Sequence, residues 1–288
     1  MTEQRTPTPQ FAAPADACDA HFHVFGPAGQ YPYGSSQLRY APPVATLSDY
    51  LQHARSLGLT RHVFVQPSAY GRDNRCMLDA MREMGIASCR GIVDIDEHAP
   101  DADLADMNAR GVRGVRINVS PVHPQEAGLV DRLLPRIERL AARCAELGWH
   151  LDFLLPGWLT AELMPVLRNL QLPFSLAHMG MNLARDGVDA PGFQALLELV
   201  RHGDRMAYVK FTGIYRISKV AGFIDADPLA RALIAAAPDR LIWGSDYPHL
   251  SFSENHSVDL YNLLARWTGD DKVRKMILTE NPARLFGF

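Results

Sequence analysis

Eight short apolar runs rich in β-branched residues recur along these 288 residues, and segments with helical apolar spacing separate them. We predict strands at 19–25, 62–68, 90–95, 111–118, 150–155, 174–178, 207–213 and 240–246. Helices are predicted between them, for example at 47–58, 74–85, 129–148 and 191–203, each ending in a glycine that suits a left-handed cap. Eight strand–helix repeats predict one distorted (β/α)8 TIM barrel. The alternative, a doubly wound open sheet, needs a glycine-rich phosphate turn or an edge strand, and neither is found.

The composition is that of a globular protein with a substantial core, at 47% hydrophobic and 21% charged residues. A net charge of -3 without a run of Lys or Arg argues against nucleic-acid and membrane partners. The four cysteines show no metal or redox spacing, and no apolar run is long enough to span a bilayer. We therefore expect a cytoplasmic protein.

Two regions of unequal length are expected. Residues 1–17 are rich in Pro, Thr and Ala and lack the apolar segment of a signal peptide, so we predict a flexible N-terminal arm. Residues 18–288 show no shift in composition, and we predict that they form one barrel domain.

Polar residues with useful chemistry fall at the ends of the predicted strands, where the active site of a barrel forms. His21 and His23 are two residues apart on the first strand, so both side chains should enter the barrel while Phe22 packs outward. His178 ends the sixth strand and Asp246 ends the eighth. A lone buried histidine is more often a core residue, but this combination favours a site.

Seven motifs carry a resemblance to a known family. They are CDAHFHVFGPAGQYPY (18–33), VQPSAYGRDN (65–74), RGVRIN (113–118), LAHMG (176–180), VKFTGIYR (209–216), LIWGSDYPH (241–249) and ENPARLFGF (280–288). The chain resembles the amidohydrolase superfamily (amidohydrolase-related family 2), and more narrowly its branch that contains 2-pyrone-4,6-dicarboxylate lactonase. The resemblance implies a barrel that hydrolyses carboxylated lactones from the breakdown of aromatic compounds or sugar acids.

The resemblance also implies roles for individual residues. Asp246 would activate water, and His21, His23 and His178 would polarise the lactone carbonyl. The expected substrate contacts are Arg116 and Arg216, which resemble carboxylate clamps, together with Tyr40, Ser68 and His249. In this reading water attacks the carbonyl, Asp246 takes its proton and imidazole N–H groups stabilise the oxyanion.

No cofactor is expected, because the lactonase branch works without a metal. Metal-dependent members of the superfamily typically add a histidine on the fifth strand, and here that position falls on Leu154. Binuclear members add a bridging lysine or glutamate on the fourth strand, which here offers Arg116 and Asn118. The alternative is a single divalent metal such as zinc, held by His21, His23, His178 and Asp246.

Two departures bear on the substrate. The lactonase places a second arginine six residues after the one matched by Arg116, and here that position is Val122. With Leu154 on the fifth strand, this favours a monocarboxylated or differently substituted lactone over the pyrone dicarboxylate. Two other functions stay open, a metal-dependent hydrolase or decarboxylase and a barrel that only binds a carboxylated ligand. The oligomeric state stays open as well.

Overall fold

The computed structural model describes residues 7–35, 38, 40–202 and 206–288. Eight parallel strands form one sheet in the order of the chain. They are β1 (Cys18–Phe22), β2 (Arg61–Val65), β3 (Cys89–Val93), β4 (Val112–Asn118), β5 (His150–Leu154), β6 (Phe174–Leu176), β7 (Ala207–Phe211) and β8 (Leu241–Trp243). Each strand pairs with its sequence neighbour, which confirms the predicted barrel topology.

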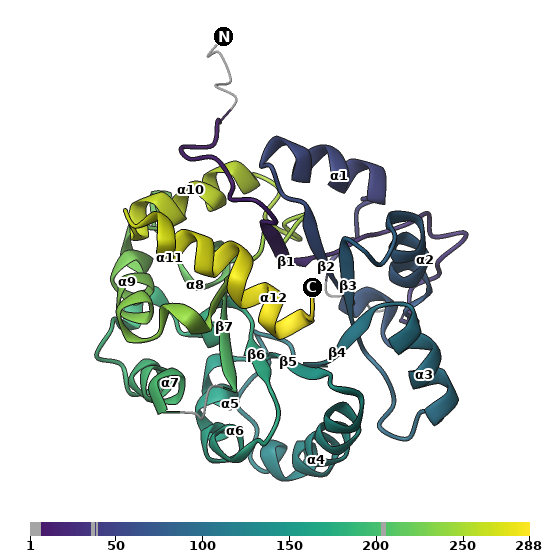
Figure 1. Cartoon of the computed structure of the whole chain (residues 1–288). Helices are drawn as coiled ribbons and strands as arrows, with labels where there is room; N and C mark the ends of the chain where they lie inside the picture. Colours follow the sequence, from purple (N-terminus) through teal and green to yellow (C-terminus); the bar gives the residue numbers. More distant parts are fainter. Residues whose placement is uncertain (1–6, 36–37, 39, 203–205) are drawn as a thin grey trace.

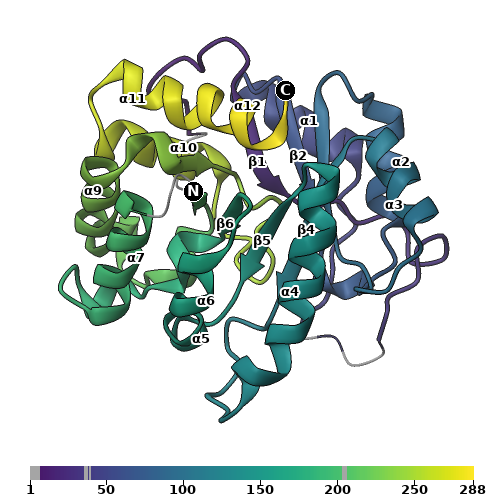
Figure 2. The ribbon, with the colours of Figure 1, turned by 60° about the horizontal axis from the view of Figure 1, so that its bottom comes forward.

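A ring of helices surrounds these strands (Figure 1), and the same ring is visible from a second direction (Figure 2). The α-helices are α1 (Leu47–Ser56), α2 (Arg75–Met84), α3 (Asp101–Ala109), α4 (Leu129–Leu147), α5 (Gly157–Glu162), α6 (Met164–Asn169), α7 (Pro191–His202), α8 (Ile214–Ile217), α9 (Asp227–Ala236), α10 (Ser257–Trp267), α11 (Asp271–Lys275) and α12 (Asn281–Phe286). Among the described residues, no helix is both long and apolar enough to cross a membrane.

Several strands end earlier than the sequence predicts. β6 ends at Leu176 and β8 at Trp243, whereas the predicted strands reach residues 178 and 246. The reason is visible in the backbone, because His178 and Asp246 have φ values of 51° and 57°. A left-handed residue cannot continue a strand. Both side chains therefore sit on the turns that immediately follow the strands.

β1 contains a bulge in its pairing with β2. The register between β1 and β2 shifts between Asp19 and Phe22, so Ala20 packs in the interior cluster while Phe22 stacks outward on Tyr50 at 3.5 Å between ring centroids. The Asp19 carboxylate accepts the backbone N–H of His21 at 3.1 Å. A β-bulge re-aims side chains in this way near active sites.

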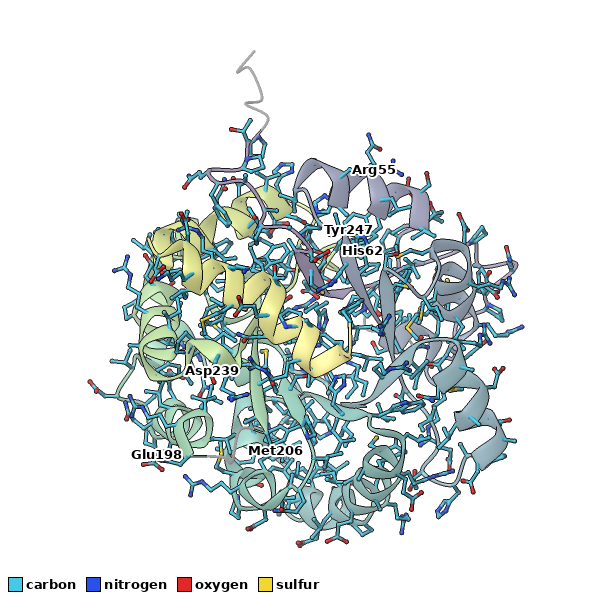
Figure 3. The ribbon with its side chains drawn as sticks, in the orientation of Figure 1. Arg55, His62, Glu198, Met206, Asp239 and Tyr247 are labelled. Carbon is cyan, nitrogen blue, oxygen red and sulfur yellow. The ribbon has the colours of Figure 1, made fainter. Side chains whose placement is uncertain are left out.

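The segment after β8 completes the closure. Asp246 N–H donates to the His21 carbonyl at 2.9 Å, and His23 N–H donates to the Tyr247 carbonyl at 2.8 Å. On the outer side of β1, Tyr50 lies between His62 and Tyr247, with ring centroids 5.5 and 5.7 Å away; both neighbours are labelled in Figure 3. The strand carrying the two histidines is thereby fixed against the residue expected to activate water.

The opposite end of the barrel is covered by α12, which crosses it in Figure 1. Leu285 and Phe286 pack into the interior cluster, and the Phe286 ring lies 5.2 Å from that of His150 at the start of β5. The strand starts are thus filled by side chains. A ligand can reach the barrel interior from the strand ends.

The N-terminal segment contacts the helical ring. Residues 1–6 of the predicted arm lie outside the described residues. Phe11 stacks on Tyr261 of α10 at 4.4 Å between ring centroids, and Gln10 N–H donates to Asn262 at 2.8 Å. The flexibility of residues 1–17 and the boundary at residue 18 stay predictions.

His150 predicts a measurable acid sensitivity. Burial lowers the pKa of His150 to about 4, below the ordinary value of a histidine. The folded state therefore binds fewer protons than the unfolded chain between pH 6.5 and 4, and stability falls as the pH is lowered through this window. His150→Asn should flatten this dependence by about 2–3 kcal/mol, measured by urea unfolding at both pH values. Parallel pH curves for parent and variant would contradict the assignment.

Candidate active site

Asp246 is a buried carboxylate with one oxygen occupied and one open. Its Oδ2 accepts hydrogen bonds from Tyr215 Oη at 2.6 Å and Arg216 Nε at 2.9 Å. Its Oδ1 has no hydrogen-bond partner among the described residues and lies 3.5 Å from His21 Nε2 and 3.7 Å from His23 Nε2. Burial alone would raise the pKa of Asp246, but Arg216 and the three neighbouring histidines together outweigh it, and the pKa lies well below its ordinary value. The group is a carboxylate at neutral pH.

For two of the three histidines, the hydrogen-bond partner fixes which ring nitrogen carries the proton. His23 Nδ1 lies 2.7 Å from the Val65 carbonyl, and His178 Nδ1 lies 3.1 Å from the Thr212 carbonyl. A carbonyl oxygen only accepts, so each Nδ1 carries the proton. Burial lowers the pKa of His23, and it lowers that of His178 to about 3. Both rings are neutral, and each Nε2 presents a lone pair.

Three buried charges lie one layer deeper in the barrel. Lys210 Nζ is 2.7 Å from Asp152 Oδ1, which also accepts a hydrogen bond from Ser175 Oγ at 2.6 Å. Arg116 Nε is 3.7 Å from Asp152 Oδ2 and has no hydrogen-bond partner within the described chain. Burial would raise the pKa of Asp152, but Lys210 and Arg116 hold it below its usual range. One carboxylate thus faces two cations.

A cavity of about 320 Å³ opens above these groups. Its floor includes His23, Arg116, His178 and Asp246, and Arg216 and Lys219 lie at its wall. Apolar side chains form much of the rest, namely Pro67, Pro121, Val122, Leu154, Met181, Leu250 and Phe252. Val122 is 84% exposed at this mouth. The site therefore combines a polar floor with an apolar wall.

Most of the predicted site residues meet in this cavity. Of the predicted site residues, seven line it: His23, Tyr40, Ser68, Arg116, His178, Arg216 and Asp246. Tyr40 Oη and Ser68 Oγ are 3.4 Å apart. His21 is fully buried beneath the lining, in contact with Asp246. His249 is not brought into the described lining, because its Nε2 is bonded to Ser257 Oγ at 2.8 Å.

Two residues that contact the site, Tyr215 and Gly213, are absent from the sequence-based prediction. Tyr215 precedes Arg216 and bonds the same carboxylate oxygen, so Arg216 is less free to clamp a substrate than predicted. Lys210 does follow from the sequence, because the strand-end rule selects it and strand parity places it on the inward face of β7. Gly213 follows β7 with φ at 54°, and a Cβ there would lie 2.5 Å from His178 Nδ1 and 2.9 Å from Asp246 Oδ2. No spacing rule reveals that approach.

The donor set can be tested for a divalent metal. Ligand atoms of His21, His178 and Asp246 lie within 4.8 Å of one another. His178 presents its Nε2 lone pair and Asp246 Oδ1 is open, so both fit a cation. His21 fits less well, because its Nδ1 is 3.4 Å from the Lys210 ammonium, which has no lone pair to accept a proton. His23 lies outside this group of three, so the residues that would hold a single ion are His21, His178 and Asp246.

Comparison with known proteins relates the whole barrel to one family. The family model described as Amidohydrolase matches residues 18–288. A 4-sulfomuconolactone hydrolase of Hydrogenophaga intermedia is 35% identical over 283 residues, covering 96% of this chain and 91% of the relative. A 2-pyrone-4,6-dicarboxylate hydrolase of Comamonas testosteroni is 31% identical over 294 residues, covering 96% of this chain and 92% of the relative.

A solved structure shares the same fold. It is that of a "probable 2-pyrone-4,6-dicarboxylic acid hydrolase" from Acinetobacter baumannii with citric acid bound, at 25% identity and a TM-score of 0.79. The match covers 95% of this chain and 100% of that one. The similarity thus extends over nearly the whole of this chain.

Gly213→Ala tests how closely the loop after β7 packs on the site. Gly148 is a matched control, because it is also left-handed, with φ at 65° and ψ at 27°, and a Cβ there meets nothing within 4 Å. Both alanines should lose about 1–2 kcal/mol of stability to the left-handed backbone. Gly213→Ala should lose about 1–3 kcal/mol more by collision with His178 and Asp246, measured by urea unfolding. Equal losses of stability in the two variants would show that the loop after β7 moves to accommodate the added methyl group.

Proposed function

We propose, from the premise that this chain belongs to the amidohydrolase family, that it is a hydrolase that opens a small lactone carrying an anionic group. The observation that carries the proposal is Asp246 Oδ1, an open oxygen of a buried, ionised carboxylate at the floor of a cavity. The names of the two relatives, both lactone hydrolases, support the same reaction class.

Water is activated between two acceptors. Asp246 Oδ1 and His178 Nε2 both face the cavity without a proton of their own, so a water molecule there can donate to both. As this water attacks the lactone carbonyl, its proton passes to Asp246. Tyr215 and Arg216 keep the other oxygen occupied and direct Oδ1 at the water.

The rest of the reaction follows from the same carboxyl group. Attack gives a tetrahedral intermediate with its negative charge on the former carbonyl oxygen, which a positioned N–H donor stabilises. The intermediate collapses with cleavage of the acyl carbon–oxygen bond, and the departing ring oxygen takes the proton from Asp246. One lactone and one water thus give one hydroxy acid, and Asp246 is again ionised.

The charges around the cavity favour a substrate with an anionic group. Lys210 pairs with Asp152 and Arg216 pairs with Asp246, so Arg116 shares a carboxylate that Lys210 already contacts at shorter range. Its Nε lacks a hydrogen-bond partner among the described residues. A carboxylate at this position would complete a charge-assisted pair. The apolar wall with Val122 and Leu154 suits a single such group better than two.

The two other functions predict different outcomes. In a metal-dependent hydrolase or decarboxylase, His21, His178 and Asp246 would hold the ion, which would polarise the carbonyl and acidify the attacking water. In a barrel that only binds a carboxylated ligand, Asp246 would contribute to binding and nothing would turn over.

Asp246→Asn separates catalysis from binding. The amide keeps the shape of the side chain but cannot take a proton from water, so kcat should fall by about 10²–10⁴. Asp131→Asn, an exposed position in the first turn of α4, is the control and should keep parental kcat. Turnover of a carboxylated lactone is followed with a pH indicator, and product binding by calorimetry. A variant with parental kcat would rule out Asp246 as the base.

Arg116→Lys tests recognition of the anionic group. Lysine keeps the charge but loses the planar fork, so KM for a carboxylated lactone should rise about tenfold or more. Arg113→Lys is the control and should leave KM unchanged. Arg113 lies on the same strand, but it points outward and bonds Asn108. The methyl ester of the lactone should be nearly insensitive to Arg116→Lys. An equal rise in KM for acid and ester would contradict the assignment.

Chelation tests the metal-dependent alternative. The purified protein should hold well under one equivalent of zinc, manganese or other divalent metal, and dialysis against a chelator should leave kcat unchanged. Metal content is measured by mass spectrometry on the same samples that are assayed. A stoichiometric metal whose removal abolishes turnover, and whose return restores it, would overturn the metal-free proposal.

A further inference from the structure

Lys210 is a fully buried cation that the proposed reaction does not use directly. Its Nζ contacts three groups: Asp152 Oδ1 at 2.7 Å, the Ala20 carbonyl at 3.4 Å and His21 Nδ1 at 3.4 Å. An ammonium group has three protons and no lone pair, so it donates to each of these partners. Burial lowers the pKa of Lys210, and the carboxylate of Asp152, itself fully buried, opposes this shift and favours the ammonium form.

His21 differs from the other two histidines in what its Nδ1 faces. His23 and His178 face backbone carbonyls and must carry their proton on Nδ1. His21 Nδ1 faces an ammonium, so it must accept, and its proton resides on Nε2. That Nε2 lies 3.5 Å from Asp246 Oδ1 and has no hydrogen-bond partner among the described residues.

We propose that Lys210 is a positioning residue that fixes the tautomer of His21, so that His21, alone among the three site histidines, directs an N–H at Asp246 Oδ1, the oxygen that takes the proton from water. Asp152 and Ser175 hold Lys210 in place from below. The division of labour follows from the partners: His21 donates, whereas His23 and His178 present lone pairs. The kinetic consequence rests on the proposed function, but the tautomer does not.

The first test reads the tautomers directly. Long-range ¹H–¹⁵N correlation spectra of the ¹⁵N-labelled, full-length protein distinguish imidazoles protonated at Nδ1 from those protonated at Nε2. Each ring is assigned by the loss of its signals in a His→Gln variant. We expect His21 in the Nε2–H form and both His23 and His178 in the Nδ1–H form. An Nδ1–H form of His21 in the parent protein would overturn the proposal without any variant.

The second test removes the ammonium. Lys210→Met removes the ammonium and leaves the Asp152 carboxylate facing Arg116, 3.7 Å away. Ser175→Ala is the control, since it also removes a hydrogen bond to Asp152 and keeps Lys210 paired with that carboxylate. Only Lys210→Met should move the His21 Nδ1 resonance toward that of a nitrogen without a hydrogen bond, with His23 and His178 unchanged. An unchanged His21 Nδ1 resonance in the variant without Lys210 would show that Lys210 does not bond this nitrogen, and would overturn the proposal.

Kinetics of the same two proteins test the consequence. Relative to Ser175→Ala, Lys210→Met should lose about tenfold or more in kcat with KM changed less than twofold, because Asp246 Oδ1 loses the N–H that orients it. A parallel loss in kcat and in folded fraction would mean that Lys210 is merely structural. If the tautomers are as expected but neither protein nor parent hydrolyses any lactone, the proposed function fails and the assignment of Lys210 stands.

Discussion

The whole site depends on how the barrel closes between β1 and residues 245–247. Asp19 accepts the backbone N–H of Ser245 at 2.9 Å and its hydroxyl at 2.6 Å, and two backbone hydrogen bonds then join His21 and His23 to the same segment. These contacts connect residues more than 220 positions apart in the chain. Because Asp246 lies inside this closure, its carboxylate and both histidines are placed by backbone geometry and not by flexible side chains alone.

The closed barrel also buries several charged side chains close together in its interior. Burying an unpaired carboxylate or ammonium is costly, and the barrel meets that cost with two pairs, Lys210 with Asp152 and Arg216 with Asp246. The lower pair supports His21, and the upper pair holds Asp246 ionised with one oxygen open. Arg116 shares Asp152 with Lys210, and under the proposed function a substrate anion completes its pairing. Reactivity and recognition thus share one electrostatic arrangement.

The sequence predicts the barrel and the residues at its strand ends because both follow from periodicity: strand parity places His21 and His23 on one face, and the strand-end rule adds His178 and Asp246. It does not predict that Arg216 bonds Asp246, because that depends on a short helix, α8, that turns the side chain back. Tautomers depend on which atom faces each ring nitrogen across the barrel, and no residue pattern encodes a distance of that kind. The same holds for the packing of Gly213 against His178.

The most direct test of the account is a single turnover in H₂¹⁸O with enzyme in excess over a carboxylated lactone. If Asp246 activates water that attacks the carbonyl, one ¹⁸O should appear in the new carboxylate of the product in the first turnover, with none in the hydroxyl group and none in Asp246. Label in the side chain of Asp246 would show that it attacks the lactone itself. A converted lactone without any label would show rearrangement in place of hydrolysis, and either result would contradict the account.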